Sequence, residues 1–243
     1  MQYWALTDPG VVREQNQDTC QVVQLDKNTL LCVVCDGMGG AKSGNVASSL
    51  AADVFTQEVK RTYTSDMSQE RLEQMLEGAV KLANFTVFDQ SQQFEEFQGM
   101  GTTLVALLIH GKEATLVNIG DSRGYMITDS GISQVTVDHS VVQMMIARKE
   151  LTPEKAKTYP GKHLITRALG TENQVVCDFY HRKVGKGTCF LLCSDGLSNM
   201  IDDQEILFEV AHGQDREKCC ERLLDIAKKR GAPDNVTSVL VEV

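Results

Sequence analysis

The stretch LLCVVCDGMGG, residues 30–40, joins an apolar run to an aspartate and a group of glycines. A similar arrangement recurs in CFLLCSDGL (189–197) and in TLVNIGDSR (115–123), and Asp234 stands directly before the apolar run 236–243. An ionised carboxylate at the end of a buried strand has a large desolvation cost unless a positive group lies opposite it. Four such aspartates, each followed by Gly, Asn or Ser, indicate that the positive partner is a divalent metal ion in a hydrolytic site.

The bulk composition favours a single large globular domain. The chain has 243 residues, of which 42% are apolar, and this is enough to bury a substantial core. Its formal net charge of −9 argues against nucleic acid or an anionic membrane as the main partner. An anionic substrate is compatible with this charge, because a bound metal ion reverses the sign of the charge locally.

The sequence favours a cytoplasmic protein with reduced thiols. Residues 1–10 have neither the basic region nor the apolar stretch of a signal peptide, and the longest apolar runs are far shorter than a membrane span. Most of the eight cysteines lie in apolar, strand-like stretches, where Cys behaves as a small hydrophobic residue. Cys32 and Cys35 have the spacing of a redox or zinc pair, but on a strand they would point to opposite faces.

The hydrophobic pattern predicts two groups of strands with helices beside them. Apolar residues at helical spacing predict helices at about 43–61 and 68–90. Two more helices are predicted near the end of the chain, capped by Asp202 and Asp215, the second ending before Gly231. This order indicates one α+β layered domain and not alternating βαβ units. The predicted strands cover residues 19–25, 29–36, 102–109, 114–119, 124–128, 175–182, 188–194 and 236–243.

Residues 136–170 do not follow this pattern. A short helix is predicted from about Ser140 to Lys149, followed by a turn at 152–153 and a loop around 159–161. This stretch has less apolar surface to bury than the rest of the chain. We therefore expect a mobile flap over about residues 138–165.

Asp36 and Gly37 are the strongest single element of the candidate site. Asp36 would bridge two cations, and Gly37 has no Cβ to keep its carbonyl oxygen away from one of them. Oxygen ligands suit hard ions, and so they favour Mg²⁺ or Mn²⁺ over zinc. An Asp-Gly pair on its own can equally make a tight turn, but Asp195 and Asp234 at other strand boundaries favour the metal site.

Arg13 and Asp18 lie close together in the segment Arg13-x-x-Asn16-Gln17-Asp18. A guanidinium group offers a planar fork for two phosphate oxygens, although an arginine at this place can also be an ordinary surface residue. Asp18 is either a metal ligand or an acceptor that orients metal-bound water from outside the coordination sphere.

Eight short motifs occur in an order that resembles the metal-dependent protein phosphatases of the PPM family (type 2C) in their short bacterial form. Each motif alone is weak, but together they extend over residues 13–237. The motifs are Arg13-x-x-Asn16-Gln17-Asp18, Asp36-Gly37-Met38-Gly39-Gly40, Gly101-Thr102-Thr103, Gly120-Asp121-Ser122-Arg123, Asp138-His139-Ser140, Thr166-Arg167-Ala168-Leu169-Gly170, Ser194-Asp195-Gly196-Leu197 and Asp234-Asn235-Val236-Thr237.

The resemblance implies a fold and a set of metal ligands. The fold is a four-layer α-β-β-α sandwich of two antiparallel sheets flanked by helix pairs, with residues 1–243 as a single catalytic domain. Asp36, Asp195 and Asp234 would ligate one metal ion. Asp36 and the Gly37 carbonyl would hold the second, and Asp121 with Asp195 would form a weaker third site.

The activity implied by the resemblance is the hydrolysis of phosphoserine and phosphothreonine in proteins. Two Mn²⁺ or Mg²⁺ ions would share a water molecule and lower its pKa, and the bridging hydroxide would attack phosphorus directly. Arg13 would hold the substrate phosphate and act in catalysis together with Asp36, Asp195 and Asp234. We expect a cytoplasmic monomer whose partners are phosphorylated proteins, with a bacterial serine/threonine kinase working in opposition.

Three positions depart from the family pattern. Met38 stands where some members carry a histidine, which leaves the proton donor to the leaving group unassigned between metal-bound water and His139. Gln17 stands where many members have glutamate, and this removes a charge near the second metal ion. Asn199 stands where many members have an aspartate, and this weakens the predicted third site.

Other readings of the motifs fit less well. A non-catalytic member of the fold that senses or binds a partner would be expected to lose core ligands, yet Arg13, Asp36, Asp195 and Asp234 are all present. A phosphatase dedicated to one regulatory protein in a partner-switching pathway usually carries extra regulatory domains, which we do not expect here. The order of the motifs disfavours an unrelated two-metal hydrolase.

Overall fold

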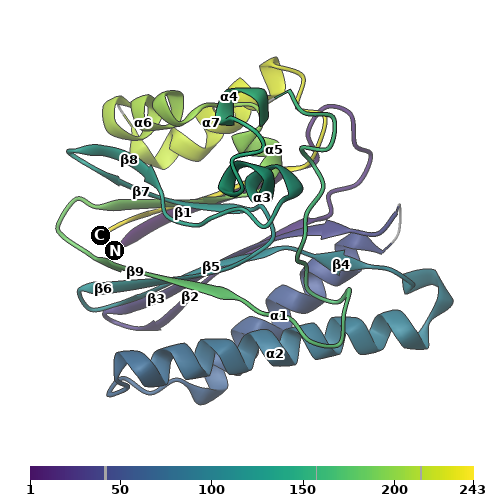
Figure 1. The fold of residues 1–243 in the computed structure, drawn as a ribbon. Coiled ribbons are helices and arrows are strands. Elements are labelled where there is room, and N and C mark those ends of the chain that lie inside the picture. The colour runs from purple at the N-terminus through teal and green to yellow at the C-terminus, as the bar shows by residue number, and fades with distance from the viewer. Residues whose placement is uncertain (41–42, 157, 214) are drawn as a thin grey trace.

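The computed structural model describes residues 1–40, 43–156, 158–213 and 215–243. Two antiparallel β-sheets lie face to face, and helices cover both outer faces (Figure 1). This is the four-layer α+β sandwich that the resemblance implied. The helices and strands mostly agree with the predicted ranges, and they differ at a few positions.

The first sheet joins strands from both ends of the described chain. Strand β1 pairs with β11 along its whole length, from Gln2 opposite Glu242 to Asp8 opposite Val236. Neither β1 nor β8 was among the predicted strands. Both lie at sheet edges and bury little, so their apolar signal is weak. The strand order is β1 (Gln2–Asp8), β11 (Val236–Glu242), β10 (Cys189–Cys193), β7 (Arg123–Thr128) and β8 (Gly131–Gln134).

The second sheet contains most of the strands predicted in the first half of the chain. Two of its predicted strands differ: the last begins at Asp178 instead of Val175, and the strand predicted over 102–109 is divided in two at Thr103. A short strand, β4 (Gly101–Thr102), pairs with the end of β3, so that Gly37 lies opposite Thr102. The order is β2 (Asp18–Asp26), β3 (Thr29–Met38), β5 (Leu104–His110), β6 (Glu113–Ile119) and β9 (Asp178–Lys183).

Three hydrophobic cores hold the four layers together, and strand β3 contributes to two of them. Leu31 and Cys35 pack against the helices, whereas Leu30 and Cys32 pack between the sheets. Successive side chains of a strand point to opposite faces, and β3 is buried on both. Cys32 and Cys35 therefore lie on opposite faces as predicted, and all eight cysteines of the chain are free thiols.

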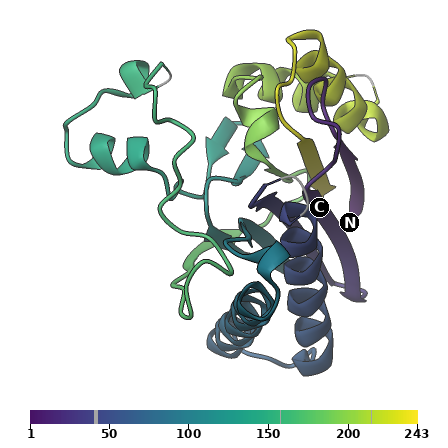
Figure 2. The ribbon, with the colours of Figure 1, turned by 90° about the vertical axis from the view of Figure 1, so that its right-hand side faces the viewer.

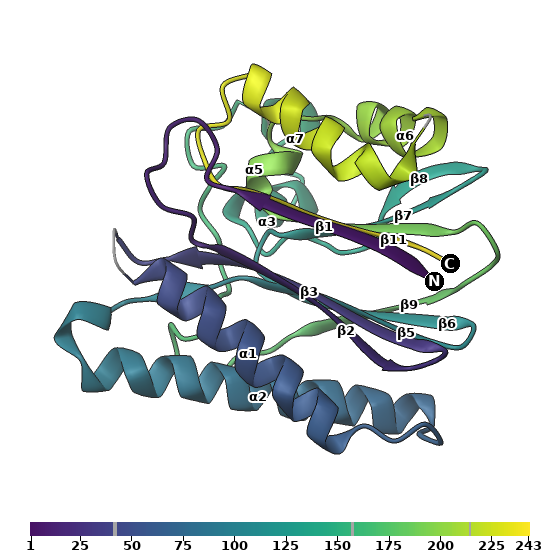
Figure 3. The ribbon, with the colours of Figure 1, turned by 180° about the vertical axis from the view of Figure 1, so that it is seen from behind.

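Helices α1 (Gly44–Thr62) and α2 (Gln69–Gln93) cover the second sheet, and α6 (Asp203–His212) and α7 (Cys219–Lys229) cover the first (Figure 3). The capping box of α6, in which Asp202 and Glu205 each accept the other's backbone N–H, is present as predicted. Among the described helices, none is long and apolar enough to cross a membrane.

The predicted cap at Asp215 was wrong in one respect. Asp215 caps the short 3₁₀ turn η2 (Arg216–Lys218), and α7 begins only at Cys219. The end of α7 was predicted correctly, because Gly231 follows it with φ +92°, a backbone conformation that favours glycine. A second 3₁₀ turn, η1 (Glu95–Phe97), follows α2.

The segment 138–165 stands apart from the sandwich (Figure 2). It contains helix α3 (Val141–Ala147), capped by the Ser140 hydroxyl, and the short helix α4 (Pro153–Ala156). The predicted helix therefore ends at Ala147 instead of Lys149. No residue of α3 is buried, which agrees with the low apolar content of this stretch.

Two glycines that follow predicted metal ligands are required by close backbone packing. A Cβ on Gly37 would lie 2.0 Å from the Gly44 carbonyl oxygen, at the start of α1. A Cβ on Gly196, in the short helix α5 (Asp195–Ser198), would lie 1.9 Å from the Asn235 carbonyl oxygen. Neither contact leaves room for a side chain, so these glycines let the aspartate-bearing segments approach one another.

We expect Gly196→Ala to lower the free energy of unfolding by about 1–3 kcal/mol, because the new methyl group would overlap a backbone carbonyl. Urea unfolding followed by circular dichroism measures this change. Gly78→Ala is the matched control. Gly78 is exposed within α2 with open space around its Cβ position, so alanine there should stabilise by up to about 1 kcal/mol. Equal effects of the two variants would contradict the packing role of Gly196.

Candidate active site

A pocket of about 920 Å³ at one end of the sandwich is lined by all the predicted site residues except Asp18. Asp36 lies near the end of β3, Asp121 follows β6, Asp195 follows β10, and Asp234 precedes β11. The carboxylates therefore reach the pocket from strands of both sheets. Its lining includes Arg13, Asp36, Gly37, Asp121, Asp195 and Asp234, as well as Gln17, Met38, Thr103 and His163.

The backbone of Asp36 is fixed by two threonines. The Asp36 N–H donates to Thr103 Oγ1 at 2.9 Å, and the Thr103 N–H and Thr102 Oγ1 both donate to the Asp36 carbonyl oxygen at 2.9 Å. Thr103 Oγ1 also lies 2.7 Å from the hydroxyl of Ser122, beside Asp121. The motif Gly101-Thr102-Thr103 thus positions the central aspartate and connects it to the next one, a role that its sequence alone did not reveal.

Asp18 lies behind the pocket and does not line it. It stands directly opposite Asp36 in the β2–β3 register, and its Oδ2 accepts hydrogen bonds from Ser194 and Thr237 at 2.7 Å each. Its other oxygen, Oδ1, is buried without a hydrogen-bond partner in the described part of the chain. Buried polar atoms are rarely left unsatisfied, so Oδ1 indicates a donor, such as metal-bound water, that comes from outside the protein.

Burial and mutual repulsion raise the pKa values of several carboxyl groups. Burial raises the pKa of Asp18 to about 6 against the hydrogen bonds from Thr237 and Ser194, and the charges of Asp195 and Asp234 add to the rise. Burial, with the charges of neighbouring aspartates, raises the pKa of Asp36 well above its ordinary value. Like-charged groups that share a dehydrated site oppose each other's ionisation.

Asp121 and Asp195 show the same two effects. Burial raises the pKa of Asp121 to about 7, and the charges of Asp195 and Asp138 add to the rise, against Arg123. Burial and Asp234 also raise the pKa of Asp195, while His163 opposes that rise. A cation in this pocket would let these carboxyl groups ionise together.

The donor set of the pocket fits hard divalent ions. Carboxylate and carbonyl oxygens are the ligands that Mg²⁺ and Mn²⁺ prefer, and the unsatisfied Asp18 oxygen and the raised pKa values both indicate a missing positive partner. Within the described ranges, however, no three acidic side chains already converge on one point as a closed metal site. Asp234 pairs with Arg13 through Oδ2, so an ion bound at that oxygen would compete with Arg13 for it.

Arg13 lies on the rim of the pocket. Its Nη2 donates to Asp234 Oδ2 at 2.8 Å, and about half of the Arg13 side chain is exposed. The loop that carries Arg13 is held by Asn235, whose Nδ2 donates to the carbonyl oxygens of Pro9 and Gln15 at 3.0 and 2.9 Å. Asn235 Oδ1 accepts the Gln17 N–H at 2.8 Å. Asn235, next to Asp234, thus ties the loop of Arg13 to the start of β11. Its motif alone did not indicate this role.

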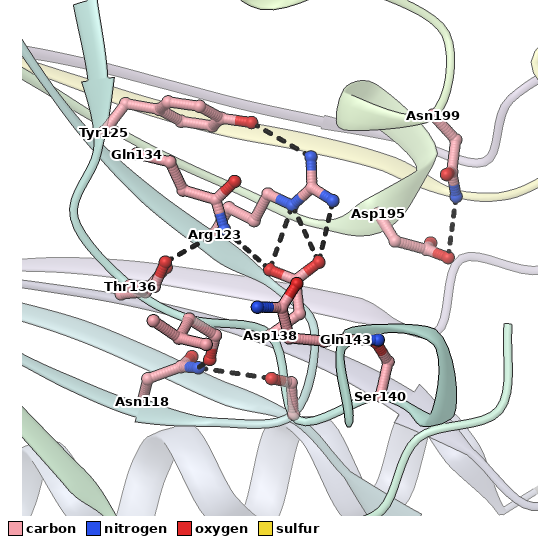
Figure 4. Close-up of polar contacts among 12 residues, drawn as sticks. Asn118, Arg123, Tyr125, Gln134, Thr136, Asp138, Ser140, Gln143, Asp195 and Asn199 are labelled. Carbon is pink, nitrogen blue, oxygen red and sulfur yellow. Dashed lines mark hydrogen bonds and ion pairs between the residues drawn. The ribbon is translucent and has the colours of Figure 1, made fainter. Parts of the chain in front are cut away.

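A second cavity of about 750 Å³ lies between the segment 138–165 and helices α5 and α6, and it shares Asp121 and Asp195 with the first. Asn199 Nδ2 donates to Asp195 Oδ2 at 3.0 Å (Figure 4). Asn199 therefore binds Asp195 with a neutral donor at the place of the predicted third metal site. This contact is consistent with the expected weakening of that site.

The base of the segment 138–165 is tied to the strand that follows Asp121. The Arg123 guanidinium donates to both oxygens of Asp138, the closest at 2.7 Å, and Gln134 donates to Asp138 Oδ1 at 2.7 Å (Figure 4). The orientation of the segment is thus coupled to β7 and β8. These contacts were not visible in the sequence, because a tight ion pair between two distant motifs leaves no local pattern.

Of the two histidines in the segment 138–165, only His163 reaches the active-site pocket. The ring of His139 is buried and lines neither cavity. Its Nδ1 accepts the Gly120 N–H at 3.1 Å, and Nε2 lies 3.0 Å from Asp178 Oδ2. Burial lowers the pKa of His139, against the hydrogen bond to Asp178. His163 lines the active-site pocket, and sequence reasoning missed it because it lies outside every motif.

A two-sheet sandwich with carboxylates gathered at one end and an arginine on the rim defines the class of this protein as a phosphatase of the PPM architecture. The family model described as protein phosphatase 2C matches residues 11–240. The chain belongs to this family.

Individual relatives agree with the family. The chain is 33% identical to the serine/threonine phosphatase stp of Listeria monocytogenes, over 97% of this chain and 93% of the relative. The structure of serine/threonine phosphatase Stp1 from Staphylococcus aureus has a TM-score of 0.93 at 33% identity, covering 99% of this chain and 94% of the other. The catalytic domain of PstP in complex with two manganese ions has a TM-score of 0.85 at 34% identity, covering 99% and 97%.

The raised pKa values predict a pH dependence of stability without metal. A group whose pKa is higher in the folded state stabilises the fold at low pH, and this contribution is lost as the pH rises through the folded value. For Asp18 and Asp121 the loss falls between about pH 4 and pH 7, and for Asp18 it amounts to roughly 2–3 kcal/mol. Thermal unfolding in EDTA should therefore show a lower melting temperature at the upper end of this window.

Adding Mn²⁺ should raise the melting temperature. The rise should be larger at about pH 7 than at about pH 4, because ionised carboxylates bind the ion better. Asp36→Asn should reduce this metal-dependent rise. A metal effect that is the same at both ends of the window would contradict the role of these carboxyl groups.

Proposed function

We propose that this serine/threonine phosphatase hydrolyses phosphoserine and phosphothreonine in proteins with two Mn²⁺ or Mg²⁺ ions held in the 920 Å³ pocket. The observation that carries the proposal is the convergence of Asp36, Asp195 and Asp234 on one pocket with Arg13 at its rim. The two manganese ions bound by the PstP catalytic domain, a structural neighbour, support the choice and number of ions.

The proposed ligands divide between two ions. Asp36, Asp195 and Asp234 would hold the first ion, and Asp36 with the Gly37 carbonyl would hold the second. Asp18 would accept a hydrogen bond from ion-bound water through its free Oδ1. When bound, the ions would lower the pKa of a shared water molecule and neutralise charge on the phosphate.

Asp121 is proposed to take part, with Asp195, in a weaker third site. It lines both cavities, so it is placed between the main pocket and the segment 138–165. The contact from Asn199 Nδ2 to Asp195 limits the negative charge available there.

Arg13 is proposed to bind the substrate phosphate. Its exposed guanidinium stands at the entrance, where a phosphorylated side chain must pass, and it can donate two parallel hydrogen bonds to phosphate oxygens. If an ion takes Asp234, Arg13 loses its carboxylate partner and becomes free to bind the phosphate. Metal binding and substrate binding would then favour each other.

We further propose that residues 1–243 work as one catalytic domain, with residues 138–165 as the flap beside the active site. The exposed helix α3 and the contacts of Asp138 at the base support this role. The eight free cysteines support a reducing compartment, the cytoplasm. There a monomer would remove phosphate from substrates of a bacterial serine/threonine kinase.

Asp36→Asn should abolish hydrolysis of a phosphothreonine peptide, because the amide removes the charge that both ions share. The assay compares phosphate release in Mn²⁺ and in EDTA. Asp129→Asn, an exposed aspartate in the turn between β7 and β8, is the matched control and should retain activity. Metal-independent turnover, or an active Asp36→Asn variant, would contradict the two-metal proposal.

Arg13→Ala should raise KM for the phosphopeptide by about 10- to 100-fold, because charge-assisted hydrogen bonds contribute about 1.5–3 kcal/mol. Steady-state kinetics at saturating Mn²⁺ gives KM and kcat separately. Arg71→Ala on α2, an exposed arginine away from the pocket, serves as the control. An unchanged KM in Arg13→Ala would exclude phosphate binding by this residue.

A further inference from the structure

Hydrolysis of a phosphoserine or phosphothreonine must end with a proton on the leaving oxygen. An alkoxide is a poor leaving group near neutral pH, so a positioned acid contributes substantially to the rate. Met38 follows the Asp36-Gly37 pair and carries no proton to donate. The donor is therefore either ion-bound water or a group in another part of the pocket, and only the latter can be sought among the side chains.

Most residues that line the pocket are unsuited to this task. The aspartates are assigned to the ions, and a guanidinium such as that of Arg13 does not release its proton in a protein. Gln15, Gln17 and Thr103 are not acids, and the exposed carboxyl group of Glu14 is not an imidazole that can both give and regain a proton near neutral pH. Among the described lining residues, only His163 carries an imidazole, the group best suited to proton transfer at neutral pH.

The backbone around His163 is held in place while its ring is free. The Val141 N–H donates to the Leu164 carbonyl oxygen at 2.8 Å, and the Thr166 N–H donates to the His139 carbonyl oxygen at 2.7 Å. These bonds anchor the chain directly after His163, where the segment returns to the sandwich. The His163 side chain is exposed and forms no hydrogen bond or ion pair with the described part of the protein, so both ring nitrogens are available to a substrate.

His163 also reaches the pocket from a different part of the chain than the carboxylates do. The carboxylates belong to the sandwich, whereas His163 comes from the segment 138–165. In an in-line displacement the leaving oxygen lies on the opposite side of phosphorus from the attacking water. A proton donor is therefore needed on a wall other than the one that the carboxylates form. His163 is still close enough to oppose the rise in the pKa of Asp195 that burial and Asp234 cause.

We infer that His163 is the general acid that protonates the serine or threonine leaving oxygen. Water forms the new bond to phosphorus, and the bond from phosphorus to the side-chain oxygen breaks with its electron pair on that oxygen. The imidazolium of His163 gives that oxygen its proton, which yields the free hydroxyl group and inorganic phosphate. Solvent then returns a proton to the imidazole. This assignment rests on the proposed phosphatase function.

The test compares two substrates that differ in their need for the proton. A phosphothreonine peptide releases an alkoxide, whereas p-nitrophenyl phosphate releases a nitrophenolate that leaves without protonation. His163→Gln should lower kcat for the peptide by about 100-fold or more and leave kcat for p-nitrophenyl phosphate nearly unchanged. His212→Gln, an exposed histidine at the end of α6, should leave both values unchanged.

Added imidazole should restore peptide turnover in His163→Ala, which a purely structural role would not allow. The inference is overturned if His163→Gln loses activity equally on both substrates, if it loses none, or if imidazole does not rescue His163→Ala. These failures are separate from failure of the proposed function. If the wild-type protein with Mn²⁺ does not hydrolyse the peptide, the phosphatase proposal itself is wrong.

Discussion

The fold has to hold several like-charged carboxyl groups close together in a pocket at one end of the two sheets. Asp18 and Asp36 face each other directly across the β2–β3 pair, and Asp195 and Asp234 reach the same region from the other sheet. Their repulsion and burial oppose folding of the ionised metal-free chain. The hydroxyls of Ser194 and Thr237 and the close contact at Gly196 keep the groups in place. Site geometry is therefore maintained at a cost in stability that a bound cation would remove.

The pattern of residues in the sequence predicted much of this arrangement, for a physical reason. Buried strands such as β3 are apolar on both faces, so an aspartate at the end of such a run is conspicuous, and the order of the motifs identified the sandwich. Edge strands β1 and β8 were missed because they bury little. The role of Asn235 was missed because its hydrogen bonds join distant segments. No local pattern of residues records such contacts.

The segment 138–165 shows that contacts between separate parts of the chain cannot be predicted from its sequence pattern. Its low apolar content was enough to predict that residues 138–165 stand apart from the core. Its attachment, however, depends on Asp138 meeting Arg123 and on His139 meeting Gly120 and Asp178. These contacts place the base of the flap beside the loop that carries Asp121. A change in the position of the segment 138–165 would therefore alter the surroundings of Asp121, which lines both cavities.

The pairing of β1 with β11 has a consequence for how the protein is made. Arg13 and Asp234 are 221 residues apart in the chain, and Asp234 is brought to the pocket only when β11 inserts between β1 and β10. During translation β11 becomes available only after all the residues that precede it have left the ribosome. Contacts of such long sequence separation form slowly. A partly synthesised chain that still lacks β11 therefore has no complete active site.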